Sequence, residues 1–95
     1  MKVSCCPKAW INFFKAGGDQ HRQRILMLIK AHQQINASDI LDKIRLSQPT
    51  LSHHIGILKH AGLIFEEKKG REVFYSLNRK NITSCCLGFM NKLVK

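Results

Sequence analysis

A change of hydrophobic spacing after Gly62 constrains the fold more than any other feature of the chain. Before it, apolar residues recur at helical spacing, as in Leu51, Ile55 and Leu58, which fall at i, i+4 and i+7. After it, the spacing changes to every second residue, as in Val73, Tyr75 and Leu77, which is the pattern of a strand. The chain is therefore expected to place helices first and a β-hairpin after them.

Four helices are expected before the change of spacing. The first begins near Pro7, whose missing amide proton suits a first helical turn, and ends at Gly17. The other three begin after Asp19, Asn36 and Ser47, whose side-chain oxygens can accept a hydrogen bond from a free amide of the first turn. The third of the four is short. A tight turn joins it to the fourth helix, so the two form a pair.

The rest of the chain predicts two strands and a fifth helix. The strands span 63–67 and 71–77, with the basic turn 68–70 between them, and helical spacing returns from Arg79 onward. One apolar stripe follows on that last helix: Ile82, Cys85, Cys86, Phe89, Met90 and Leu93. This order predicts a mainly α protein with a β-hairpin wing, a winged helix-turn-helix, as a single domain over residues 1–95.

The charge balance points to a polyanionic partner. The chain has 95 residues, with 16 Lys and Arg against six Asp and Glu, a formal net charge of +10. Nucleic acid is the first candidate and an anionic membrane surface the second, while charge that serves only to keep the protein in solution is the alternative. No run approaches the ~18 apolar residues of a membrane span, and no leader peptide is recognisable, so a cytoplasmic location is expected.

The start of the fourth helix carries the predicted DNA contact. In a helix-turn-helix the second helix enters the major groove with its N-terminal residues toward the base edges. The residues placed there are Gln48, Thr50, Ser52, His53 and His54. Contacts to the DNA backbone are expected from Lys59, Lys68, Lys69 and Arg71. A polar helix start is often only a cap, but the order of elements and the charge favour DNA binding.

Three segments resemble the ArsR/SmtB family of metal-responsive repressors. Residues 46–63, LSQPTLSHHIGILKHAGL, look like the recognition helix and the start of the wing of that family. Residues 70–77, GREVFYSL, look like its second wing strand, and residues 22–28 look like its Arg-x-x-Ile-Leu helix. The resemblance implies a homodimer formed by the first and last helices, and release from an operator when an inducer binds.

The resemblance also bears on single positions. Gln48, Ser52 and His53 match positions that contact bases or backbone in relatives, whereas Pro49 stands where a small polar residue is common. The family's Cys-x-Cys-Asp metal site is replaced by residues 36–39, Asn-Ala-Ser-Asp. The Asp, His and Glu ligands that the family uses on its last helix are absent from the tail.

Four thiols are the remaining candidates for a sensor. Thiolates bind thiophilic metal or metalloid ions, and a thiol near a helix start is more easily oxidised. Cysteine is also a small apolar residue that packs in cores, so metal or metalloid binding, redox sensing and plain packing all stay open. The residues are Cys5, Cys6, Cys85 and Cys86. No other cofactor is expected, and His21, His32 and His60 are expected at the surface.

Three other classes of protein fit the sequence less well. An enzyme is disfavoured, because the chain lacks a Gly-rich phosphate loop and a convincing Cys–His–Asp arrangement. An RNA-binding winged helix is not excluded by the sequence, but the polar start of the fourth helix favours a protein that reads a major groove, and the deep major groove of RNA does not admit a helix. A basic module that binds an acidic protein would show no preference for any DNA sequence.

Overall fold

The computed structural model describes residues 7–94. Within that range the helices are α1 (Pro7–Gly17), α2 (Gln20–His32), α3 (Ala37–Lys43), α4 (Gln48–His60) and α5 (Arg79–Val94). The strands are β1 (Ile35–Asn36), β2 (Ile64–Lys69) and β3 (Glu72–Leu77). The mainly helical fold with a wing is thus confirmed, with one strand more than the sequence predicted.

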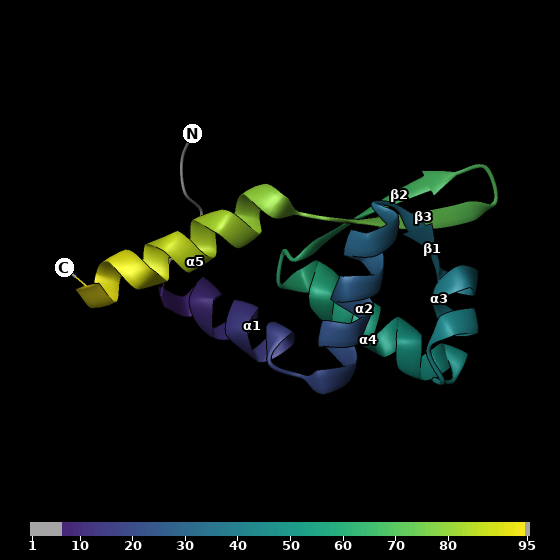
Figure 1. The fold of residues 1–95 in the computed structure, drawn as a ribbon, viewed down its shortest axis with the longest axis horizontal. Coiled ribbons are helices and arrows are strands. Elements are labelled where there is room, and N and C mark those ends of the chain that lie inside the picture. Colours follow the sequence, from purple (N-terminus) through teal and green to yellow (C-terminus); the bar gives the residue numbers. More distant parts are fainter. Residues whose placement is uncertain (1–6, 95) are drawn as a thin grey trace.

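The core lies where α2, α3 and α4 meet the sheet. Ile25 and Ile29 of α2, Ile40 of α3, and Leu51 and Leu58 of α4 are among its most completely buried side chains. Burial of one such side chain contributes about 1.5–3 kcal/mol, so this cluster holds the helix-turn-helix pair to α2. In Figure 1, α3 and the hairpin lie at one end of the molecule and α1 and α5 lie side by side at the other.

The three predicted helix caps are present. The side chains of Asp19, Asn36 and Ser47 each accept a hydrogen bond from the amide three residues further on, at 3.0, 2.8 and 3.3 Å. Each cap of this kind contributes about 1 kcal/mol. These caps set where α2, α3 and α4 begin, and so fix the tight turn between α3 and α4.

The strand β1 is not predicted by the sequence pattern. Ile35 pairs with Tyr75 and Asn36 with Phe74, which gives a three-stranded antiparallel sheet in the order β1-β3-β2. Two residues are too few to show an alternating pattern, and their partners lie some 40 positions further along the chain. This strand joins the wing to the segment between α2 and α3.

The hairpin turn also differs from the prediction. Lys68 and Lys69 continue β2 and pair with Val73 and Glu72, so the turn is the pair 70–71 alone. Gly70 has φ +64°, a conformation that glycine adopts without strain. The two lysines are therefore held on a strand rather than on a loose loop.

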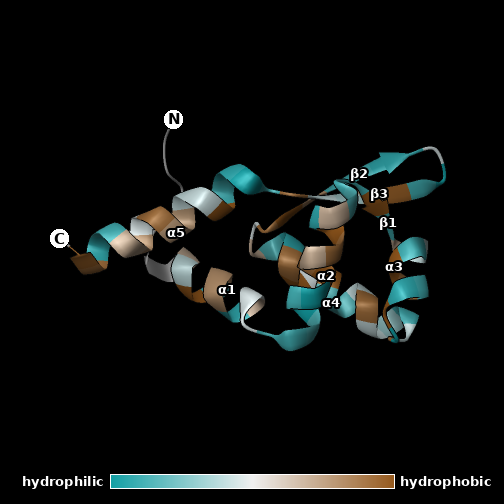
Figure 2. Ribbon diagram, in the orientation of Figure 1, coloured by the Kyte–Doolittle hydropathy of each residue, from teal (hydrophilic) through white to brown (hydrophobic). Residues whose placement is uncertain are grey.

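The end formed by α1 and α5 carries exposed apolar side chains, and Figure 2 colours parts of both helices brown for hydrophobic residues. Ile11, Phe14, Leu87, Met90 and Leu93 are between 40% and 70% exposed. The radius of gyration is 13.9 Å, whereas a chain of this length packed as one compact body has about 12 Å. The excess reflects this arm, which extends away from the core. No helix among the described residues is long and apolar enough to cross a membrane.

Candidate nucleic-acid interface

The start of α4 presents a polar surface. Gln48, Thr50, Ser52 and His53 are all exposed, and the first turn contains no acidic residue. The Ser47 hydroxyl donates to the Thr50 hydroxyl oxygen at 2.8 Å, which orders the first turn. The positive end of the helix dipole lies at the same place, so this surface favours a negatively charged partner.

His54 does not belong to that surface, which corrects the expectation that it contacts DNA. Its side chain is 8% exposed, and its Nδ1 lies 3.1 Å from Nη1 of Arg22 on α2. Because an arginine side chain can only donate, Nδ1 must accept and the ring must be neutral. Burial lowers the pKa of His54, and the charge of Arg22 lowers it further against an opposing effect of Asp19.

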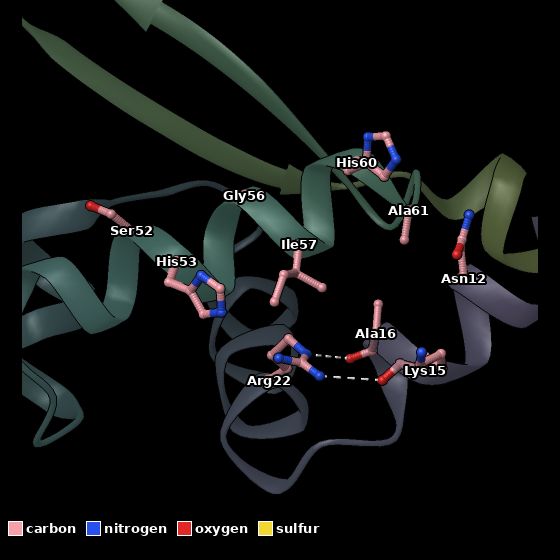
Figure 3. A pocket seen from close by; sticks show the side chains of 10 residues that line it. All are labelled: Asn12, Lys15, Ala16, Arg22, Ser52, His53, Gly56, Ile57, His60 and Ala61. Atoms are coloured by element: carbon pink, nitrogen blue, oxygen red, sulfur yellow. Dashed lines mark hydrogen bonds between the residues drawn. The ribbon is translucent and has the colours of Figure 1, made fainter.

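Arg22 joins three helices through one side chain. Besides its bond to His54 of α4, its Nε donates to the Ala16 carbonyl oxygen at 2.8 Å and its Nη2 to that of Lys15 at 3.3 Å. Those carbonyls belong to the last turn of α1, where helical i+4 amide partners are lacking and only a 3.4 Å bond from the Gly18 amide reaches the Lys15 oxygen. Figure 3 shows the two bonds to α1 as dashed lines. Sequence reasoning did not identify Arg22, since its partner in α4 lies 32 positions away.

The basic residues expected to contact the DNA backbone are exposed, but two of them have partners: Lys59, at the end of α4, and Lys69, on the wing. Lys59 forms an ion pair with Glu66, which raises the pKa of Lys59. Lys69 donates to Gln34 at 2.9 Å, and its Nζ lies 5.4 Å from the centre of the Phe74 ring. The side chains of Lys68 and Arg71 are likewise exposed, next to the tip of the hairpin.

The thiols fall into three groups. Cys85 is 1% exposed and disulfide-bonded, while Cys86 beside it is a half-buried free thiol. Cys5 and Cys6 lie outside the described residues. Within residues 7–94, no group of three or more His, Cys, Asp or Glu side chains could hold a metal ion.

Comparisons with known proteins agree with this geometry. A sequence model described as "Bacterial regulatory protein, arsR family" matches residues 19–65. The transcriptional repressor SdpR of Bacillus subtilis is 39% identical over 84 residues, which is 85% of this chain and 92% of SdpR. An uncharacterized HTH-type transcriptional regulator of Methanocaldococcus jannaschii is 42% identical over 62 residues, covering 65% of this chain and 70% of the relative.

Solved structures show the same fold. An ArsR-like transcriptional regulator from Rhodococcus superposes with a TM-score of 0.83 at 21% identity, covering 92% of this chain and 81% of that one. At 21% identity, this similarity shows that the two chains share the arrangement of helices and wing.

Proposed function

The chain belongs to the arsR family of bacterial regulatory proteins, and we propose that it represses transcription by reading an operator with the start of α4. The observation that carries this proposal is the exposed, acid-free surface at that helix start. As a member of a family of DNA-binding regulators it is not an enzyme, as the sequence predicted. Its proposed target is operator DNA, so we place it in the cytoplasm.

Base reading and backbone binding fall to different residues in this proposal. Gln48 can bond an adenine through two hydrogen bonds, and the hydroxyl and imidazole groups of Thr50, Ser52 and His53 can bond other base edges. The wing supplies contacts to phosphates, which add affinity without sequence information. The residues assigned to that role are Lys68, Lys69 and Arg71 of the wing, together with Lys59 at the end of α4.

We also propose that residues 1–95 act as one domain that dimerises through α1 and α5. The support is the exposed apolar arm that includes Ile11, Phe14, Leu87 and Leu93. A symmetric dimer would bury this surface and present two α4 helices to the two halves of an operator. Sedimentation is the test, and a stable monomer at micromolar concentration contradicts the proposal.

Release from DNA is assigned to the thiols. Cys85 lies on α5, the helix proposed for the dimer interface. Because Cys85 is disulfide-bonded, thiol oxidation is favoured over metal binding as the sensing chemistry. Two thiols that form a disulfide give two protons and two electrons to an oxidant, so a peroxide is the proposed class of signal. The oxidised protein must bind DNA less tightly than the reduced one, because equal affinities would shift nothing. Cys5, Cys6 and Cys86 are the other thiols available for this chemistry.

The DNA proposal is tested with a duplex that the wild-type protein selects from a random-sequence library. Gln48→Ala and Ser52→Ala should each cost about 1–3 kcal/mol on that duplex and relax the sequence preference. Arg71→Ala should instead weaken binding to selected and unrelated duplexes alike, and Lys30→Gln on α2 serves as a charge control. Equal affinity of the wild type for all duplexes, or tighter binding to double-stranded RNA, contradicts the proposal.

The thiol proposal is tested by titrating the DNA-bound, reduced protein. Peroxide should release wild-type protein, and Cys85→Ser should abolish the release while leaving the affinity of the reduced protein nearly unchanged. Release by arsenite or cadmium under reducing conditions would assign the thiols to a metal or metalloid instead. No release by any of them would leave packing as the role of these cysteines.

A further inference from the structure

A groove of about 490 Å³ separates the last turn of α1 from the outer face of α4. Its α4 side is formed by Ser52, His53, Gly56 and His60, and Lys15 stands on its α1 side. Figure 3 shows these side chains on the two facing helices. Ser52 and His53 also belong to the surface proposed to read bases, so the groove is continuous with that surface.

The charged residues that line the groove are all basic, and the rest of the lining is neutral and partly apolar. Its lining includes the charged residues Lys15 and Arg22 and two histidines, and it includes no aspartate or glutamate. Asp19, which precedes α2, uses its carboxylate to cap that helix by accepting from the Arg22 amide. The carbonyl oxygens at the end of α1, which would repel an anion, are covered by the Arg22 guanidinium. A negatively charged group is therefore the occupant that this lining favours.

Gly56 gives a second, independent reason to expect an outside partner. It lies inside α4, where glycine costs about 0.5–1 kcal/mol relative to alanine. A Cβ added there would meet no protein atom within 4 Å, so packing within the chain does not require glycine. The space that it leaves open lies on the groove, where a partner can approach the helix backbone closely.

We propose that this groove seats a phosphate of the DNA backbone beside the major groove that α4 enters, with Lys15 as its principal cationic contact. The inference rests on the proposed function, because the duplex must first be docked on α4. It extends the DNA-binding surface from the helix-turn-helix and the wing to α1, a helix otherwise assigned to dimerisation. A duplex is the source of the phosphate because the groove continues the surface on which base edges are proposed to lie.

The experiment measures the affinity for the selected duplex against salt concentration, for wild type, Lys15→Gln and Lys30→Gln. Both variants remove one exposed lysine charge, but only Lys15 lines the groove. Loss of one phosphate contact lowers the slope of log affinity against log salt by about 0.9 per protomer. We expect that loss for Lys15→Gln and a wild-type slope for Lys30→Gln.

A second variant tests the groove without removing charge. Gly56→Leu should fold with unchanged or higher thermal stability, because leucine favours a helix and its Cβ meets open space. It should nevertheless weaken binding to the duplex at least tenfold. In the Gly56→Leu protein, the further change Lys15→Gln should no longer alter the salt slope. If wild type prefers no duplex, the proposed function fails. If wild type binds its selected duplex but Lys15→Gln keeps the slope of Lys30→Gln, only the groove inference is overturned.

Discussion

Replacing Arg22 by alanine removes three hydrogen bonds that join α1, α2 and α4. A hydrogen bond involving a charged group contributes about 1.5–3 kcal/mol, and less where water competes. The bond to His54 is buried on the histidine side, the bond to Ala16 is short, and the bond to Lys15 is long and exposed. Counting the first two at the low end of that range, we expect Arg22→Ala to destabilise the fold by about 2–3 kcal/mol.

Thermal unfolding followed by circular dichroism at pH 8 measures the effect. For a domain of this size 1 kcal/mol corresponds to about 4–8 °C, so the midpoint should fall by about 10–20 °C. Arg24→Ala is the matched control, because Arg24 is an exposed arginine on the same helix. If the midpoints of the two variants coincide, the reasoning about Arg22 is refuted.

A double-mutant cycle isolates the bond between Arg22 and His54. His54→Ala also opens a cavity, but that loss is present in both arms of the cycle and cancels. We expect the double variant to be more stable than the sum of the single losses predicts, by about 1 kcal/mol or more. Additive losses would mean that the two side chains contribute independently, whatever the 3.1 Å between them.

Three further predictions concern pH, backbone conformation and charge. The pKa of His54 is lowered in the fold, so neutral His54 stabilises the protein above the ordinary histidine pKa of 6.5. This stabilisation is lost as the pH falls below 6.5. Urea titrations at several pH values should show that His54→Asn lacks this pH dependence. Gly62→Ala should cost about 1–3 kcal/mol in urea unfolding, because φ is +79° and the new Cβ would lie 2.5 Å from Nδ2 of Asn81. Glu66→Gln frees Lys59 and should raise affinity for any duplex by about two- to fivefold, as gel-shift titration at fixed salt would show.

Local interactions explain which parts of the fold could be predicted. The caps at Asp19, Asn36 and Ser47 involve residues three positions apart, so the sequence contains both partners in one short segment. The helix pair and the hairpin follow from spacing in the same way. The short strand at Ile35 could not be predicted, because its only signal is its partner Tyr75 on a distant strand.

The candidate site shows the same limit at the level of side chains. The polar start of α4 predicts that His54 contacts DNA with its neighbours. However, Leu51, His54 and Leu58 fall at i, i+3 and i+7 and share the buried stripe of α4. That spacing was a usable signal that one of the two adjacent histidines points inward. Nothing in the sequence indicated Arg22 as its partner, since the contact forms only when α2 packs across α4. The groove between α1 and α4 depends on the same packing.

The pairing of lysines near the wing is compatible with the proposed DNA contacts. Lys59 is held by Glu66, and Lys69 by Gln34, which also donates to Glu67. An exposed ion pair contributes about 0–1 kcal/mol, so exchanging a carboxylate for a phosphate costs little. Binding a duplex also releases the counterions condensed on its backbone, which favours the exchange at low salt. Glu66 and Gln34 therefore order these two lysines without competing strongly against DNA for them.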